Sequence, residues 1–177
     1  YGPAKNRQWL MVDLGVAFAG EDLPGIDLIL PNIAFIEERK ANLAGIVLTH
    51  AHEDHYGAVA DLWSRLGVPI YCTEFAAGLL EIRRLSEPGA PKVPIRKIGQ
   101  ATRFKVGPFD LETIPVAHSI PESCALAIRT PLGTVLHTGD WKIDTTPVLG
   151  LPTNEARLKE IGDEGVLALV CDSTNIL

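Results

Sequence analysis

The sequence has few cysteines, no long apolar run and no excess of positive charge. Its three cysteines lie far apart, and none forms a Cys-x-x-Cys pair. An odd number of cysteines among apolar neighbours indicates reduced, mostly buried thiols, which excludes a disulfide scaffold and disfavours a zinc site built on cysteine. No apolar run approaches the roughly 20 residues that a membrane span requires. The first residues also lack the apolar core of a signal peptide, so we expect a cytoplasmic protein that does not enter a membrane.

The charge balance excludes a simple basic nucleic-acid-binding module. Sixteen Lys and Arg stand against 22 Asp and Glu, for a formal net charge of −6. Such modules obtain their affinity from Lys and Arg on phosphates. The balance leaves a nuclease open, because bound divalent cations offset acidic charge at a site and a separate domain can supply a basic groove.

Strands and helices alternate along the chain, and its length fits one domain with a sizeable core. Residues 166–172 form a nearly continuous apolar run, which predicts a strand buried on both faces. Strand–helix units next to hairpins fit a layered α/β sandwich better than a purely parallel sheet. The pattern predicts strands at 10–14, 45–49, 69–72, 103–106, 109–116, 124–129 and 134–138, helices at 33–40, 58–66, 74–85 and 155–161, and a loop at 86–94.

Both ends of the sequence lie close to expected strands. Tyr1 stands where a methionine would open a complete chain, and the last apolar run ends a few residues before Leu177. We therefore expect this chain to be a piece of a larger protein.

The strongest chemical signal is the segment His50-Ala51-His52-Glu53-Asp54-His55, which follows a buried strand and precedes a helix. Imidazole and carboxylate groups are the usual ligands of zinc and similar divalent ions. In extended chain His50 and His52 project to one side, while Asp54 and His55 can face a second position as the helix begins. The spacing predicts two adjacent ions rather than a solvated polar loop, and we expect Glu53 to point away from them.

Two further candidate ligands follow other strands. His118 comes after the strand expected at 109–116, and Asp140 comes after the one at 134–138. Ligands at the ends of separate strands converge at one edge of a sandwich. The two oxygens of an aspartate can bridge two cations.

The order His-x-His-x-Asp-His, then a histidine, then Thr-Gly-Asp resembles the signature of the metallo-β-lactamase superfamily. The resemblance implies an αββα sandwich, incomplete in this chain, and two divalent ions, zinc first with Mn²⁺ or Mg²⁺ as alternatives. It also implies that Asp13 supports the site through hydrogen bonds rather than binding metal. His137 lies at the end of an apolar strand, so we expect a core or supporting residue there rather than a ligand. The implied ligands are His50, His52 and His118 for the first ion, Asp54 and His55 for the second, and Asp140 for both.

Three further strings resemble the ribonuclease J family of the β-CASP group. They are His118-Ser119-Ile120-Pro121-Glu122-Ser123, Thr138-Gly139-Asp140-Trp141-Lys142-Ile143-Asp144 and Asp172-Ser173-Thr174-Asn175. The resemblance implies that residues 1–177 are a partial metallo-β-lactamase-like domain that ends where a β-CASP domain would be inserted. It implies that a late histidine ligand and a C-terminal domain lie outside this chain, and that the full protein can form a homo-oligomer.

The function implied by this resemblance is metal-dependent hydrolysis of RNA phosphodiester bonds, as a 5′-3′ exonuclease, an endonuclease or both. Asp54 and Asp140 would be the catalytic residues that hold a metal-bridged hydroxide. Two alternatives stay open: a lactone or thioester hydrolase of the same fold, and an inactive metal-binding fragment. Ser119, Ser123 and Ser173 are candidate phosphate contacts, or else turn-forming serines. Lys142 would meet a phosphate or stay solvated, and Trp141 would stack on a base or pack in the core.

Overall fold

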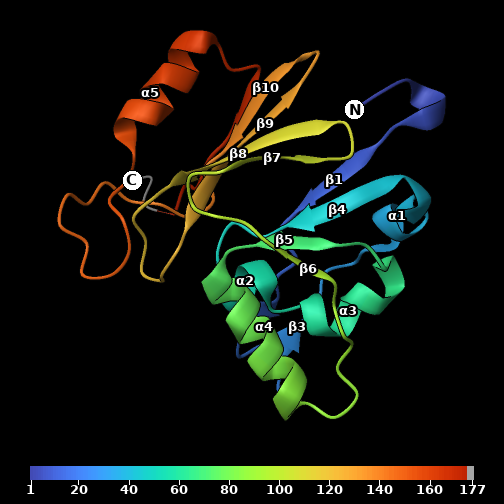
Figure 1. Cartoon of the computed structure of the whole chain (residues 1–177). Helices are drawn as coiled ribbons and strands as arrows, with labels where there is room; N and C mark the ends of the chain where they lie inside the picture. The colour runs from blue at the N-terminus through green and yellow to red at the C-terminus, as the bar shows by residue number, and fades with distance from the viewer. Residues whose placement is uncertain (175–177) are drawn as a thin grey trace.

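The computed structural model describes residues 1–174, and in it two β-sheets pack against each other with helices on the outside (Figure 1). The first sheet is entirely parallel, in the order β1-β4-β5-β6. The second has the order β11-β10-β9-β8-β7, and only its β10–β11 pair is parallel. The strands of the first sheet are β1 (Trp9–Val12), β4 (Leu43–Val47), β5 (Ile70–Cys72) and β6 (Ile95–Lys97); those of the second are β7 (Arg103–Val106), β8 (Phe109–Pro115), β9 (Cys124–Thr130), β10 (Gly133–His137) and β11 (Ala168–Val170).

Helices cover the outer face of each sheet. Four lie on the side of the first sheet, and α5 (Glu155–Glu164) packs on the second. A small antiparallel pair, β2 (Ala17–Phe18) and β3 (Leu28–Ile29), stands in the loop after β1. The helices of the first sheet are α1 (Ala34–Glu37), α2 (Glu53–Tyr56), α3 (Val59–Leu66) and α4 (Glu74–Ser86), with 3-10 turns at η1 (Ala4–Asn6) and η2 (Lys40–Asn42).

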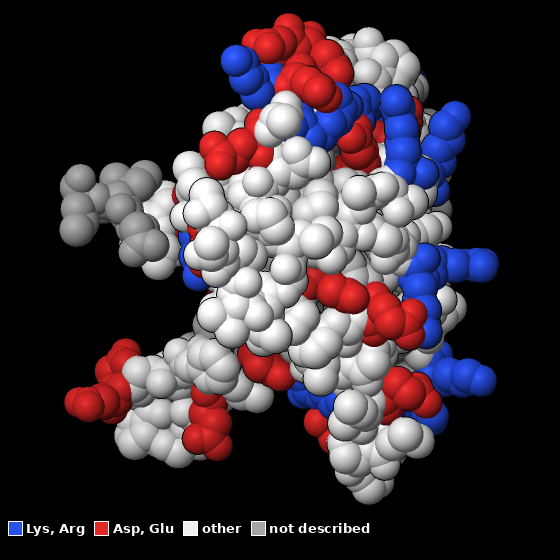
Figure 2. Space-filling view, turned by 60° about the vertical axis from the view of Figure 1, so that its left-hand side comes forward, with Lys and Arg blue, Asp and Glu red and all other residues white. Residues whose placement is uncertain are grey.

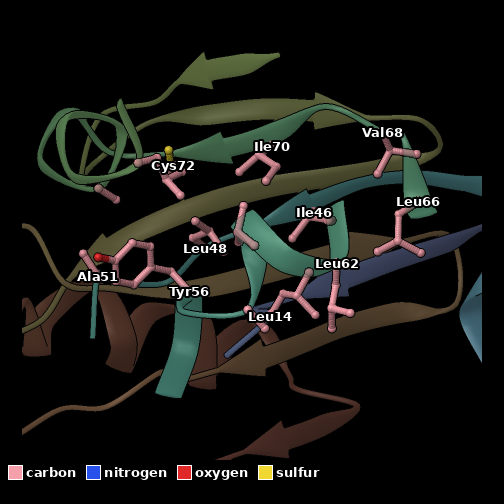
Figure 3. Close-up of a cluster of buried hydrophobic side chains, with 14 of the residues drawn as sticks. Leu14, Ile46, Leu48, Ala51, Tyr56, Leu62, Leu66, Val68, Ile70 and Cys72 are labelled. Carbon is pink, nitrogen blue, oxygen red and sulfur yellow. The ribbon is translucent and has the colours of Figure 1, made fainter. Parts of the chain in front are cut away.

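Three apolar clusters separate the layers. Between the first sheet and its helices, Leu62 and Leu66 of α3 pack with Ile46 and Ile70 (Figure 3). A second cluster, which includes Leu126, lies between the two sheets, and a third, which includes Ile161 of α5, lies behind the second sheet. Helix, sheet, sheet and helix therefore follow one another, which confirms the predicted αββα sandwich.

Local sequence explains why α3 forms and why it ends at Leu66. Val59, Leu62 and Leu66 recur at helical spacing and are all buried. Such a stripe stabilises a helix by packing against a core. Gly67 then adopts a left-handed φ of 68° and donates its N–H to the Trp63 carbonyl, which ends the helix.

The prediction that the last strand is buried on both faces is wrong. Leu169 and Val170 of β11 are 60% and 49% exposed. β11 pairs with β10 on one side only, and no other strand in the described range 1–174 pairs with its other edge. Cys171, beside it, is also exposed, whereas Cys72 and Cys124 are buried as expected.

Two shorter elements also differ from the sequence pattern. β6 was not predicted, because its residues are mostly polar and follow a proline-rich loop. α1 ends at Glu37, and a separate 3-10 turn (Lys40–Asn42) begins at the last residue of the helix expected at 33–40.

Charged side chains are unevenly spread over the surface. On the face shown in Figure 2 a broad uncharged area is bordered by acidic side chains, and the Lys and Arg side chains stand mostly along one edge. This face therefore offers no continuous basic groove to a phosphate backbone. Among the helices of residues 1–174, none has the length and apolar character that a membrane crossing requires.

Candidate metal centre

The six residues predicted as ligands lie together where the strands of both sheets end. His50 follows β4, His118 follows β8 and Asp140 follows β10, while Asp54 and His55 belong to the short helix α2. Their side chains form two groups, and within each group one ligand atom per residue lies within 4.8 Å of the others. The first group is His50, His52, His118 and Asp140; the second is Asp54, His55 and Asp140.

Three imidazole nitrogens converge in the first group. His52 Nδ1 lies 3.1 Å from His50 Nε2 and 3.0 Å from His118 Nε2. Asp140 Oδ2 lies 4.0 Å from His50 Nε2 and 3.7 Å from His118 Nε2. This group therefore presents three nitrogens and one oxygen to a common point.

The second group uses the other oxygen of the same aspartate. Asp140 Oδ1 lies 3.3 Å from His55 Nε2, and Asp54 Oδ2 lies 3.6 Å from that nitrogen. One oxygen of Asp140 thus faces each group, which is an arrangement that allows the carboxylate to bridge two ions.

These distances fit bound divalent cations. At a zinc–nitrogen distance of about 2.0–2.1 Å, tetrahedral geometry puts neighbouring ligand atoms roughly 3.3 Å apart. The separations of 3.0 to 4.0 Å in the first group and 3.3 to 3.6 Å in the second lie around that value. The donors are imidazole and carboxylate, without cysteine, which is the ligand set of catalytic rather than structural zinc sites.

In two of the four ligand histidines, burial favours the neutral form that a metal ligand needs. Desolvation and the neighbouring histidines lower the pKa of His50 to about 2. Desolvation also lowers the pKa of His118. Burial acts in the same direction on the pKa of His55, but the hydrogen bond and charge of Asp13, with Asp140 and Asp54, outweigh it and raise that pKa.

Asp13 fixes the orientation of two of these rings. Its Oδ2 lies 2.7 Å from His55 Nδ1 and accepts a 2.8 Å hydrogen bond from the Thr49 hydroxyl, and its Oδ1 accepts one from the Thr49 amide. The Thr49 oxygen in turn lies 3.0 Å from His50 Nδ1. With Nδ1 protonated in both rings, Nε2 of His50 and of His55 carries its lone pair toward the ligand groups. The structure thus gives Asp13 the supporting, hydrogen-bonding role.

Replacing Asp13 with asparagine should weaken metal binding without disturbing the backbone. Asp13 has a φ of 62°, and asparagine is among the residues that tolerate this conformation. The amide cannot accept from both Thr49 and His55 with the strength of a carboxylate, so we expect the affinity for metal to fall by about 10- to 100-fold. Calorimetric titration with Zn²⁺ measures it. Asp110→Asn, at an aspartate that pairs with Arg103 on β7, is the matched control, and equal affinities in the two variants would contradict the role.

The candidate phosphate contacts lie in different surroundings. Ser119 is exposed, with its hydroxyl 3.5 Å from His52 Nε2. Ser123 is buried and donates to the Ile120 carbonyl, which is the turn-forming alternative. Ser173 is exposed and follows Asp172, whose amide hydrogen-bonds the Thr138 hydroxyl beside Asp140; Asn175 of the same string lies outside the described residues.

The remaining candidate residues lie outside the two ligand groups. Glu53 belongs to neither ligand group, as expected. Trp141 is partly buried against the cluster behind the second sheet, and Lys142 forms an ion pair with Asp144 at 3.0 Å. His137 accepts a hydrogen bond from the Gly139 amide and belongs to neither group.

Sequence reasoning missed the role of Gly15. A Cβ atom placed there would lie 1.7 Å from the Asp54 carbonyl oxygen and 1.9 Å from its carbon. On either side of Gly15, the Leu14 and Val16 amides donate to the His55 and Glu53 carbonyls at 2.7 and 3.0 Å. The chain after β1 therefore lies directly against the backbone of the ligand helix. A glycine two residues after Asp13 is the signal in the sequence that points to this close approach.

Comparison with known proteins identifies the family of the chain. Residues 9–157 match a family model described as "Beta-lactamase superfamily domain". The chain is 58% identical over 177 residues to ribonuclease J of Sinorhizobium meliloti, covering all of this chain and 31% of that protein. It is 42% identical over 168 residues to ribonuclease J of Helicobacter pylori, covering 94% of this chain and 24% of that one. The chain thus spans less than a third of the length of these relatives.

A similar fold occurs in a solved structure of low sequence identity. The metallo-beta-lactamase fold protein YhfI from Bacillus subtilis superposes with a TM-score of 0.52 at 20% identity, covering 74% of this chain and 49% of that one. At that identity the likeness concerns the fold alone.

Proposed function

The chain belongs to the metallo-β-lactamase superfamily, and from that premise we propose that it carries the metal centre of a hydrolase that cuts phosphodiester bonds in RNA. The observation that carries the proposal is the position of Asp140, with Oδ2 toward His50 and His118 and Oδ1 toward His55. A single ion would not need one oxygen of Asp140 on each side. Two adjacent ions can share a carboxylate in this way, and such pairs act in phosphoester hydrolysis.

The bound ions would lower the pKa of a water molecule toward neutrality and neutralise charge on a phosphoryl group. The protein's own contribution is to hold the ligands in place before the ions arrive. Asp13 orients His55 directly and His50 through Thr49. Asp54, whose side chain is 57% exposed, and Asp140 are the carboxylates that we assign to orienting the attacking water. Zinc suits the nitrogen-rich first group, with Mn²⁺ or Mg²⁺ as alternatives.

The relatives named ribonuclease J support RNA as the substrate. We propose 5′-3′ exonuclease action, endonuclease action or both, in the cytoplasm. The chain has a net charge of −6, so we assign RNA binding chiefly to parts of a longer protein outside it. We propose that residues 1–177 end where a β-CASP domain is inserted, and that a C-terminal domain allows a homo-oligomer.

The test is turnover by the protein at its full encoded length. We expect it to degrade an RNA that carries a 5′-monophosphate and to leave a lactone and a thioester intact. Treatment with a chelator should abolish the cleavage, and added Zn²⁺ or Mn²⁺ should restore it. The His52→Ala variant, which lacks a ligand of the first group, should stay inactive under all these conditions. Hydrolysis of the lactone or thioester in place of RNA, or cleavage that survives both chelation and this variant, would refute the proposal.

A further inference from the structure

Helix α4 contributes no ligand to the candidate metal centre, yet it contacts two of the three segments that do. Arg83, near its C-terminal end, reaches the helix α2 that carries Asp54 and His55. The amide of Phe75, in its first turn, binds Glu122 of the loop that begins at His118. These two contacts lie at opposite ends of a 13-residue helix packed on the first sheet.

Arg83 holds both ends of α2. Its Nη1 donates to the Gly57 carbonyl at 2.7 Å and to Glu53 Oε2 at 3.4 Å. α2 has only four residues, so it depends on outside partners for its stability and for its last carbonyl groups. Because Asp54 and His55 lie between Glu53 and Gly57, fixing those two positions fixes the ligands of the second group.

The guanidinium of Arg83 is itself held in place. Its side chain is 18% exposed, and Glu87 Oε1 and Asp61 Oδ2 lie 2.9 and 3.6 Å from its nitrogens. The planar, several-donor geometry of arginine matches these separate acceptors, whereas a lysine has a single nitrogen.

Glu122 holds the His118 loop against the other end of α4. Its Oε2 accepts a 2.8 Å hydrogen bond from the Phe75 amide, and Thr73 at the helix start makes no side-chain cap. A carboxylate is favourable at a helix N-terminus. Glu122 also has a φ of 61°, which is costly for a residue other than glycine, so the surrounding contacts must hold this conformation.

We propose that α4 is a positioning element that joins two of the ligand segments of the metal centre, with Arg83 setting Asp54 and His55 and Glu122 setting His118. The inference rests on the proposed metal centre. Neither residue belongs to a ligand group, so each acts through the segment that it holds. The two contacts act on different groups, and their loss should therefore affect different ions.

Titration of the metal-free protein at its full encoded length with Zn²⁺ and with Co²⁺ tests the proposal. The absorption spectrum of bound Co²⁺ reports the ligand geometry. The Asp54→Asn variant gives the Co²⁺ spectrum and affinity expected when the second group is damaged. The His118→Ala variant gives those expected when the first group is damaged. We expect Arg83→Met to lower the affinity of the second group by about 10- to 100-fold and Glu122→Ala to do the same to the first. Glu122→Gln, which keeps an accepting oxygen, should recover much of the affinity.

Matched controls separate positioning from general loss of stability. Arg84→Met removes the neighbouring arginine of α4, which pairs with Glu81, and Glu74→Ala removes a carboxylate of its first turn, which pairs with Lys97. Both should leave the Co²⁺ spectrum and both affinities unchanged. The positioning role would be overturned if Arg83→Met and Glu122→Ala bound metal as tightly as these controls. It would also be overturned if each variant weakened both groups equally. Either result would leave the metal centre itself intact. Failure of the unsubstituted full-length protein to bind two ions would overturn the metal centre, and the inference with it.

Discussion

Replacement of Asp140 by alanine is expected to weaken the binding of both ions and to remove hydrolytic activity. This residue is the one member that the two ligand groups share. Substitutions that only support metal ligands cost about 10- to 100-fold, so loss of a bridging ligand should cost on the order of 10³-fold or more in turnover. Calorimetric titration with Zn²⁺ gives the number of ions bound, and RNA cleavage by the full-length protein gives the activity.

A nearby aspartate provides the control for that experiment. Asp144 lies four residues further along, pairs with Lys142 and belongs to neither group. Asp144→Ala should bind two ions and keep its activity. If Asp140→Ala also bound two ions with unchanged affinity, Asp140 would not bridge them.

Replacement of Gly15 by alanine is expected to destabilise the fold and to displace the ligands of the second group. The new Cβ would overlap the Asp54 carbonyl oxygen at 1.7 Å. The backbone at Gly15 and the backbone at Asp54 are both held in place by other contacts. Because neither side can yield without breaking hydrogen bonds to Glu53 or His55, we expect a loss of about 3 kcal/mol in the free energy of unfolding. Chemical denaturation of the metal-free chain measures it, and Zn²⁺ titration should show a weakened second ion.

Gly78→Ala is the matched control for Gly15→Ala. Gly78 lies on the exposed side of α4, and no heavy atom lies within 4 Å of a Cβ placed there. Alanine in a helix is favoured over glycine by about 0.5–1 kcal/mol, so this variant should be slightly more stable than the parent. Equal effects of the two substitutions would show that the close approach at Gly15 does not constrain the ligand helix.

The sequence was sufficient to predict the fold class and which side chains meet. The ligands alternate within a short segment, and the two distant ones follow strands, so the geometry of strands alone brings them to one edge. His118 is 66 residues from its neighbour His52, yet their nitrogens lie 3.0 Å apart. The prediction succeeded from local sequence alone because residue type, spacing and the positions of the strand ends all indicated the same cluster.

What the sequence could not supply was the set of contacts made by ordinary residues. Nothing local distinguishes Arg83, which reaches Gly57, from Arg84, which pairs with Glu81. The direction in which each side chain points depends on the packing of α4 on the first sheet. The exposure of β11 could not be predicted for a similar reason, because an apolar run does not show which neighbours cover it.

The central claim is that six side chains surround a pair of cations, and anomalous X-ray diffraction from crystals of the zinc-loaded protein tests it most directly. We expect two peaks about 3.5–4 Å apart, one bonded to the three histidines at 50, 52 and 118 and the other to Asp54 and His55, with one oxygen of Asp140 on each. A single peak, or ions bound away from residue 140, would contradict the account.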